Sequence, residues 1–180
     1  SHNLFTIGIF SRIEEQKGQH LVIEALHKIK PTTCQLLIVG YFMNENYKKR
    51  INNLISSYNL QNHIKFFGFI DEPMSMMPCF DLIVLPTYEE TFGLVVAESM
   101  MMGVPIIGSN AGGVPEIIKD GNNGLIFETK SSDSLTEKIS MLINDKDLRR
   151  KLAQNAKVYA EQAYNYEQHF DLLNDYIDKI

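Results

Sequence analysis

The sequence predicts an α/β fold built on a doubly wound parallel sheet, with further helices toward the C-terminus. Two patterns predict it. Short apolar segments rich in β-branched residues alternate with longer segments that carry an apolar stripe at helical spacing, and the connections between them are short. There is no internal repeat or low-complexity linker, and 180 residues fit one domain better than two. We therefore expect a single domain over residues 1–180.

The expected strands are nearly continuous apolar runs, as strands buried on both faces of a parallel sheet require. Their ranges are 4–10, 34–40, 63–69, 81–86, 105–109 and, for a short edge strand after a glycine-rich turn, part of 112–128. Ligands bind such sheets at the carboxyl ends of the strands. That rule singles out the loops after Phe10, Gly40, Phe67, Pro86 and Ser109.

The expected helices each carry one apolar face. The first places Leu21, Ala25 and Leu26 in one stripe, and the fourth ends before Gly103 and Pro105, which do not continue a helix. The expected helical ranges are 18–29, 46–58, 72–80, 91–102, 132–144, 147–163 and 167–180.

Composition excludes several classes of protein. A net charge of -5 argues against nucleic acid as the main partner. Cys34 and Cys79 lie in unrelated contexts, so we expect neither a disulfide framework nor a zinc site, and a reducing compartment is the simple interpretation. No apolar run has the length of a membrane span, and no signal peptide is found. Ser1 and His2, with no initiator Met, resemble the scar of a cleaved tag on a piece of a longer protein.

Two carboxylates, Glu90 and Glu98, stand eight positions apart around an apolar segment that follows the strand 81–86. An acid two turns inside an apolar helix is costly to bury unless a group donates hydrogen bonds to it, and a ribose diol is such a donor. Glu90 can accept hydrogen bonds from sugar hydroxyls. The alternative is that Glu90 caps the helix and Glu98 is solvated, and spacing alone does not decide between them.

The start of the same helix is a candidate site for an anion. Its first backbone N–H groups have no partner within the helix, and the helix dipole adds about 0.3–1 kcal/mol per charge. Gly93 would let a ligand approach the backbone closely. The N–H groups concerned belong to Thr91, Phe92, Gly93 and Leu94.

Two cations, Arg12 and Lys17, lie in the loop after the first strand. In a crevice that also holds the helix start, they could clamp a diphosphate, Arg12 as a bidentate fork and Lys17 as a point charge. The alternative is a solvated loop with local pairing to Glu14 and Glu15.

The remaining motifs favour structural roles. The fingerprints GxGxxG, GxxxxGK[ST] and GxSxG are missing, which argues against dehydrogenases, P-loop enzymes and α/β-hydrolases. The Asp-Lys-Asp run at 145–147 could hold a metal but is better explained by a helix cap. His20 and His27 have no acid or thiol partner at ligand spacing. Gly112 and Gly113 permit close packing against a ligand, or form a bare turn.

Five blocks, taken in order, resemble a known family. They are "FSRIEEQKG", "LLIVG", "IKFFGFI", "DLIVLPTYEETFGLVVAESMMMGVPIIGSNAGGVPEII" and "DGNNGLIF". Together they are similar to the C-terminal domain of retaining glycosyltransferases of family GT4, which would make this domain the Rossmann-like C-terminal half of a GT-B enzyme. Glu90 and Glu98 match the E-x7-E motif of that family, and the resemblance covers essentially the whole chain.

The resemblance implies a role for each matching residue. Arg12, Lys17 and Glu90 would be catalytic: the cations would bind the donor diphosphate and stabilise the leaving group, and Glu90 would contact the donor sugar. Glu98 would hold the ribose. The remaining substrate contacts would come mainly from the main chain, on the phosphate and sugar at Thr91, Phe92, Gly93 and Leu94, and on the base near Lys65 and Phe67.

The resemblance also implies a reaction, namely transfer of a hexosyl group from a UDP-, GDP- or ADP-sugar, with no metal or other cofactor. The acceptor, a glycan or lipid in bacterial polysaccharide, glycolipid or cell-surface glycan synthesis, would bind the N-terminal domain of the family, which this chain lacks along with its important His. The fragment alone should turn over little. The expected location is cytoplasmic, with peripheral association at the inner membrane face. One departure is the sequence "GYFMNENY" from Gly40, where the family often has a Gly-x-Gly-Pro-like turn.

Three other functions stay open at the level of sequence. A GT-B sugar-nucleotide epimerase or phosphorylase would be distinguished by product analysis. A non-catalytic nucleotide-binding module would bind nucleotide without dependence on a sugar. A Rossmann dehydrogenase would bind NAD, and the missing glycine fingerprint counts against it.

Overall fold

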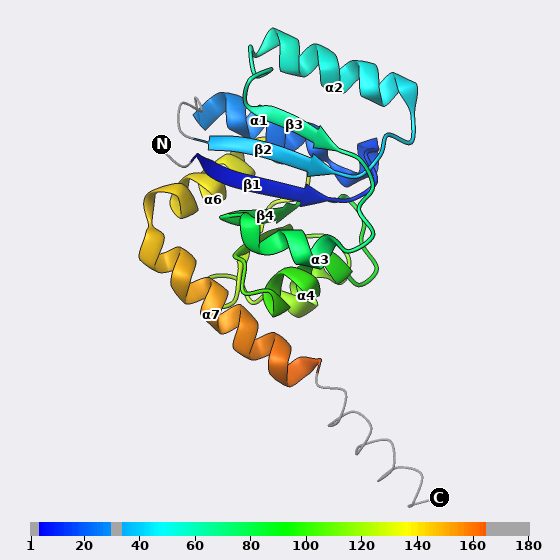
Figure 1. Ribbon diagram of the computed structural model, residues 1–180. Helices are drawn as coiled ribbons and strands as arrows, with labels where there is room; N and C mark the ends of the chain where they lie inside the picture. Colours follow the sequence, from blue (N-terminus) through cyan, green and yellow to red (C-terminus); the bar gives the residue numbers. More distant parts are fainter. Residues whose placement is uncertain (1–3, 30–33, 165–180) are drawn as a thin grey trace, which may run out of the picture.

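The computed structural model describes residues 4–29 and 34–164, which form a parallel sheet with helices on both faces (Figure 1). The sheet has six strands in the order β3-β2-β1-β4-β5-β6. The chain adds β2 and β3 on one side of β1, and then β4, β5 and β6 on its other side. The strand order therefore reverses between β1 and β4, and the loops that follow these two strands lead away from each other. The strands are β1 Phe5–Phe10, β2 Cys34–Val39, β3 Ile64–Phe67, β4 Leu82–Leu85, β5 Ile106–Ser109 and β6 Leu125–Phe127.

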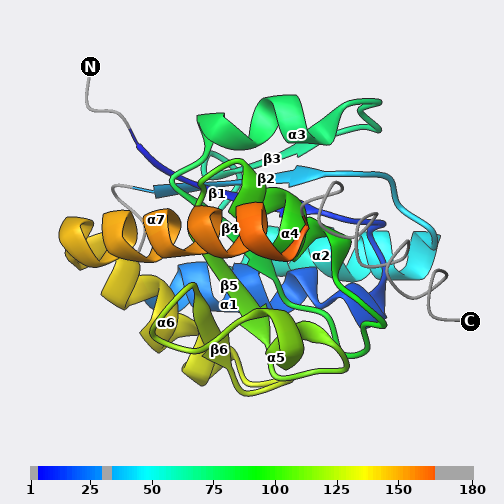
Figure 2. The ribbon, with the colours of Figure 1, turned by 90° about the horizontal axis from the view of Figure 1, so that it is seen from below.

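Two clusters of buried apolar side chains hold the layers together, one on each face of the sheet. The first lies against α1, α2 and α6, and the second against η2, α4 and α5. Helix α7 reaches both, because Leu152 belongs to the first cluster while Ala156 and Ala160 belong to the second; Figure 2 shows it running from α6 to α4. The helices are α1 Gln19–Ile29, α2 Glu45–Ser57, α3 Pro73–Met76, α4 Leu94–Met101, α5 Val114–Ile117, α6 Ser132–Asn144 and α7 Lys146–Ala163, with short 3-10 turns η1 Glu15–Lys17 and η2 Met77–Cys79.

The predicted doubly wound α/β fold is confirmed, and the elements differ from expectation at a few boundaries. The range 72–80 is divided into α3 and η2, each with a proline in its first turn. The Asp-Lys-Asp run does provide a cap, since the Leu148 N–H donates to Asp145 Oδ1 at 2.8 Å. The helix expected over 167–180 lies outside the described residues.

The expected start of α4 at Thr91 is wrong. The helix begins at Leu94, because Gly93 has a φ of 86° and so lies outside the right-handed helical region. Thr91 and Phe92 therefore belong to the loop before the helix, and their N–H groups are not part of the helix start. In the ranges that the structure describes, we find no helix long and apolar enough to span a bilayer.

Candidate functional site

Two adjoining cavities open where β1, β2 and β4 end, and Arg12 lines both of them. The one we call the Glu98 cavity has a volume of about 260 Å³ and an apolar lining that includes Tyr41 and Phe69. The other, the Glu90 cavity, has about 480 Å³ and is lined mostly by charged and polar residues, among them Lys17. Together they give an apolar part and a polar part of one site, with Arg12 shared between the two.

Lys17 and Glu90 form an ion pair in the Glu90 cavity, with 2.9 Å between Nζ and Oε2. Their side chains are 19% and 20% exposed, so this pair is more desolvated than a surface salt bridge. Lys17 ends η1, which turns at Gly18 with a φ of 67°. A Cβ on Gly18 would lie 2.0 Å from the Pro86 carbonyl oxygen, so only glycine lets this loop pack against the end of β4.

The loop that carries Glu90 is held by the backbone on two sides. The Tyr88 N–H donates to the Gln16 carbonyl at 2.8 Å, and the Gly113 N–H donates to the Glu90 carbonyl at 3.0 Å. Gly112 packs against the same carbonyl: its φ is 52°, and a Cβ there would lie 1.8 Å from the Glu90 oxygen. The glycine pair after β5 therefore serves to hold the acidic loop, a role that the sequence left open.

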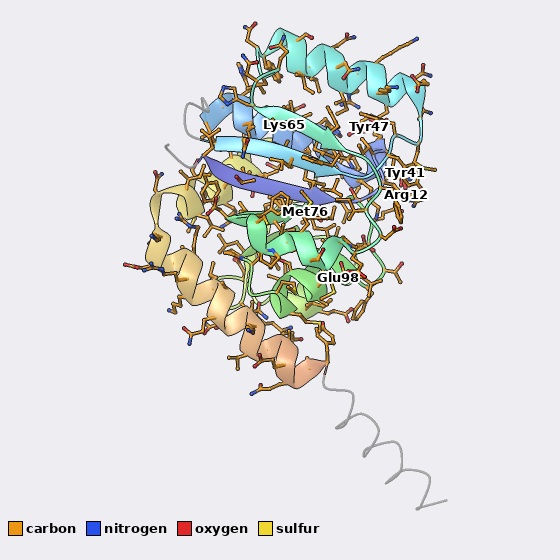
Figure 3. All side chains as sticks on the ribbon, viewed as in Figure 1. Arg12, Tyr41, Tyr47, Lys65, Met76 and Glu98 are labelled. Atoms are coloured by element: carbon orange, nitrogen blue, oxygen red, sulfur yellow. The ribbon has the colours of Figure 1, made fainter. Side chains whose placement is uncertain are left out.

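Glu98 lies on α4 (Figure 3). It lines the Glu98 cavity together with Val95 and Ile70. Burial raises the pKa of Glu98 above its ordinary value. Neither half of the alternative interpretation fits the geometry, since α4 has no side-chain cap and Glu90 pairs with Lys17 instead, while Glu98 is partly buried. A carboxylate in this setting gains most from a ligand that donates hydrogen bonds to it.

Replacing Glu98 by glutamine is expected to raise the free energy of unfolding at neutral pH. A raised pKa in the folded state means that the carboxyl stabilises the fold below the pKa of the unfolded chain, and that this contribution is lost as pH rises through the folded pKa. Urea unfolding at neutral pH and near pH 4 tests this, since roughly 4.3 is the pKa of an unfolded Glu. The gain should shrink at the lower pH. The exposed Glu128→Gln serves as control; an equal gain there, or none at Glu98, contradicts the prediction.

Arg12 is exposed over 54% of its side chain and pairs with Glu14 at 3.1 Å. The sequence allowed local pairing of the loop cations with both Glu14 and Glu15. In the structure Arg12 pairs with Glu14, while Glu15 pairs with Arg50 of α2. An exposed pair of this kind is worth little, so Arg12 is free to exchange Glu14 for an anionic ligand between the two cavities.

Lys65 and Phe67 line neither cavity. Lys65 is opposite Leu37, two positions before the end of β2, and Figure 3 shows it back along the sheet from Arg12. The Phe67 carbonyl accepts a hydrogen bond from the Gly40 N–H at 3.0 Å within the sheet. Sequence reasoning missed several residues that line the apolar Glu98 cavity, namely Tyr41, Phe69, Ile70 and Pro73. For Tyr41 and Phe69 a signal was present, because each is an aromatic residue directly after a glycine near the end of a strand.

The segment before α4 divides its side chains between the site and the surface. Thr91 lines the Glu90 cavity. Phe92 is partly exposed and meets the ring of Tyr164 edge-on, with 6.2 Å between centroids. Leu94, the first residue of the helix, is 66% exposed. Phe92, Gly93 and Leu94 line neither of the two cavities.

Known proteins are similar to this chain over most of its length. The model of the family described as glycosyl transferases group 1 matches residues 2–159. An uncharacterized glycosyltransferase of Methanocaldococcus jannaschii is 34% identical over 161 residues, which is 88% of this chain and 44% of that protein. The capsular polysaccharide biosynthesis glycosyltransferase CapM of Staphylococcus aureus is 29% identical over 163 residues, which is 89% of this chain and 42% of CapM. The chain thus spans less than half the length of these relatives.

Solved structures with the same fold include complexes with nucleotides. Anabaena HepE in complex with UDP is 29% identical with a TM-score of 0.93, over 99% of this chain and 50% of that chain. The same protein has been solved with UDP-glucose, at 30% identity and a TM-score of 0.90, over 99% of this chain and 50% of that one. The C-terminal domain of a glycosyl transferase group 1 family protein, LpcC of Francisella tularensis, is 34% identical with a TM-score of 0.83, over 90% of this chain and 87% of that one.

Proposed function

Because the chain belongs to the group 1 glycosyl transferases, we propose that it is the donor-binding domain of a retaining glycosyltransferase with the GT-B fold. The donor is a hexose linked to a nucleoside diphosphate. The observation that carries the proposal is the position of Arg12 in the lining of both cavities, which gives a base and ribose one end, a diphosphate the middle, and a sugar the other end. HepE, a structural relative, has been solved with UDP-glucose.

In the proposed reaction the protein acts by electrostatics. Arg12 and Lys17 neutralise the negative charge that grows on the diphosphate as the bond to the sugar breaks, while Glu90 holds sugar hydroxyls. The acceptor attacks from the face that the diphosphate leaves, so the anomeric configuration is retained. The positive charge that the diphosphate needs comes from Arg12 and Lys17, and we propose that no metal or cofactor is required.

The remaining parts of the proposal concern the full-length protein. A second domain binds the acceptor, closes over the crevice and excludes water. The acceptor is a glycan or lipid, and the similarity to CapM supports a place in the synthesis of bacterial polysaccharides or other cell-surface glycans. We expect a cytoplasmic protein, with peripheral association at the inner face of the membrane. Nucleic acid is not an expected partner, in keeping with the net charge of -5.

Calorimetric titration of this chain with UDP, GDP and ADP tests the donor site. We expect one of the three to bind, and Glu98→Ala to weaken that binding by about tenfold or more, because hydrogen bonds to a charged group are worth roughly 1.5–3 kcal/mol. Arg12→Ala should weaken it as well, through lost contact with the diphosphate. Lys49→Ala, an exposed cation on α2, is the matched control and should bind like the unaltered chain.

The titration separates the proposal from its rivals. Binding that is equal in all four proteins would place the nucleotide elsewhere. If none of the three diphosphates binds, the same titration on the full-length protein shows whether the site needs the second domain. Absence of binding there too would refute the proposed function.

A further inference from the structure

A line of buried hydrogen bonds joins the loop of Arg12 to the loop of Glu90, and it lies outside both cavities except at its ends. Gln19 and His20 begin α1, Tyr47 comes from α2, and Tyr88 precedes the acidic residues. Gln19 is fully buried, and His20 and Tyr47 are nearly so. The contacts between side chains are Gln19 to Tyr47 at 3.2 Å, Tyr47 to His20 Nδ1 at 2.9 Å and His20 Nε2 to Tyr88 at 2.7 Å.

The direction of the line is set at the Arg12 end. Gln19 Nε2 is 2.8 Å from the Arg12 carbonyl, which can only accept, so the amide nitrogen must face it. Its other hydrogen goes to Ser11 Oγ at 3.0 Å. Gln19 Oε1 is then an acceptor facing the hydroxyl of Tyr47, and Tyr47 must donate its single hydrogen to Gln19.

This assignment leaves one arrangement for neutral His20. Since the Tyr47 hydrogen is committed to Gln19, the Tyr47 oxygen accepts from both the His20 backbone N–H and the His20 ring, so Nδ1 carries the ring hydrogen. Nε2 is left with a lone pair and accepts the hydroxyl hydrogen of Tyr88. Burial raises the pKa of both Tyr47 and Tyr88, so both hydroxyls keep their hydrogens.

We infer that His20 and Tyr88 are positioning residues, which align the loop of Glu90 with the loop of Arg12 and Lys17; this role rests on the proposed function. Tyr88 is two residues from Glu90, and its backbone is already tied to Gln16. The bond to His20 fixes the side chain as well. The two halves of the diphosphate and sugar site are thus aligned through side chains of which Tyr88 alone lines the Glu90 cavity, while Gln19, His20 and Tyr47 line neither of the two cavities.

The line has this order only while His20 is neutral. Protonation would put a hydrogen on Nε2, which would then donate to the Tyr88 oxygen, and the hydroxyl hydrogen of Tyr88 would have to turn to another acceptor. Burial lowers the pKa of His20, and Arg50 of α2 acts in the same direction. Glu24 of α1 and Glu15 of η1 raise the pKa of His20. Within the part of the chain that the structure describes, the other titratable groups that contact the His20 ring are Tyr47 and Tyr88. The bond between His20 and Tyr88 should therefore reverse its direction on the acid side of neutrality, where the Tyr88 hydroxyl loses its acceptor.

The ring hydrogen can be located without any assay of activity. Long-range proton–nitrogen correlation spectra of this chain at neutral pH, with the signal of His20 identified by its loss in His20→Gln, report which nitrogen is protonated. We expect a protonated Nδ1 and a bare Nε2. The opposite tautomer would overturn the direction of the line.

The positioning role is tested by kinetics of the full-length protein with the nucleotide sugar that it uses. Tyr88→Phe keeps the ring but removes the hydroxyl, and is expected to lower kcat about tenfold while the Kd for the free nucleoside diphosphate changes less than about twofold. His20→Leu should have a similar effect. His20→Gln should recover part of that loss, because its amide oxygen can accept from Tyr88, and should remove the acid limb of the pH profile of kcat.

A control and two outcomes decide the matter. His27→Leu, on the same helix but stacked on Tyr58, should leave kcat and the pH profile unchanged. If Tyr88→Phe and His20→Leu only lower the stability and leave kcat and its acid limb unchanged, the positioning role is refuted. If the unaltered protein does not bind a nucleoside diphosphate, the proposed function is refuted instead. The tautomer of His20 can still be measured in that case, because that measurement needs no ligand.

Discussion

Replacement of Lys17 by methionine is expected to lower kcat/KM of the full-length enzyme by about 10²–10³, the range found when one group that stabilises a developing anion is removed. Lys17 lines the Glu90 cavity together with Arg12, and its Nζ lies 2.9 Å from Glu90 Oε2. The methionine side chain fills similar space without a charge. Charge that develops on the departing diphosphate would lose its partner, and Glu90 would be left unpaired in a partly desolvated position.

Steady-state kinetics with the preferred nucleotide sugar measures this effect. Lys49→Met removes an exposed cation on α2 and should leave kcat/KM within about twofold, as surface charges contribute little. Lys17→Arg keeps the charge and should fall between the two, because a guanidinium does not reproduce the geometry of an ammonium. Turnover by Lys17→Met at the unaltered rate would exclude Lys17 from catalysis.

Gly112→Ala is the substitution expected to damage the fold most, with a loss of about 2–4 kcal/mol in the free energy of unfolding. The added Cβ would lie 1.8 Å from the Glu90 carbonyl oxygen, and the φ of 52° adds strain for any residue but glycine. Because the blocking atom belongs to the backbone, the loop of Glu90 must move. We therefore expect nucleotide-sugar binding to fall together with stability.

A second glycine separates the contact from the strain. Gly121 has a φ of 73°, yet a Cβ there would meet nothing within 4 Å. Gly121→Ala should therefore cost only the backbone strain, about 1–2 kcal/mol, and should leave binding intact. Urea unfolding and titration of both variants give the comparison. If both variants lower the free energy of unfolding by the same amount, the contact between Gly112 and the loop of Glu90 does not contribute to stability.

The sequence predicted the fold well because its signals are local. Continuous apolar runs mark buried parallel strands, and short connections leave little choice of topology. The start of α4 was misplaced because the left-handed conformation of Gly93 depends on how the loop before it packs, and helical spacing does not report that. A residue that is free to adopt many conformations gives no sign of which one it takes.

The site was predictable in part, and for a similar reason. Charges at strand ends are visible in the sequence, so Arg12, Lys17 and Glu90 could be placed in neighbouring loops, and the structure brings them to one cavity. Which loop residue faces a cavity depends on tertiary contacts, so Phe69 was not anticipated as a lining residue. For His20 the sequence predicts only a structural role, because its hydrogen-bond partners come from other elements, far along the chain.

The ion pair between Lys17 and Glu90 has a consequence for the order of events in the proposed reaction. When the donor binds, the ammonium of Lys17 turns to the diphosphate, and hydroxyls of the sugar replace it at Glu90. After transfer the sugar has gone, so the leftover nucleoside diphosphate holds Lys17 but offers nothing to Glu90. Return of Lys17 to Glu90 then competes with that product for the same cation. The empty site would thereby regain its internal ion pair, which favours product release over product retention.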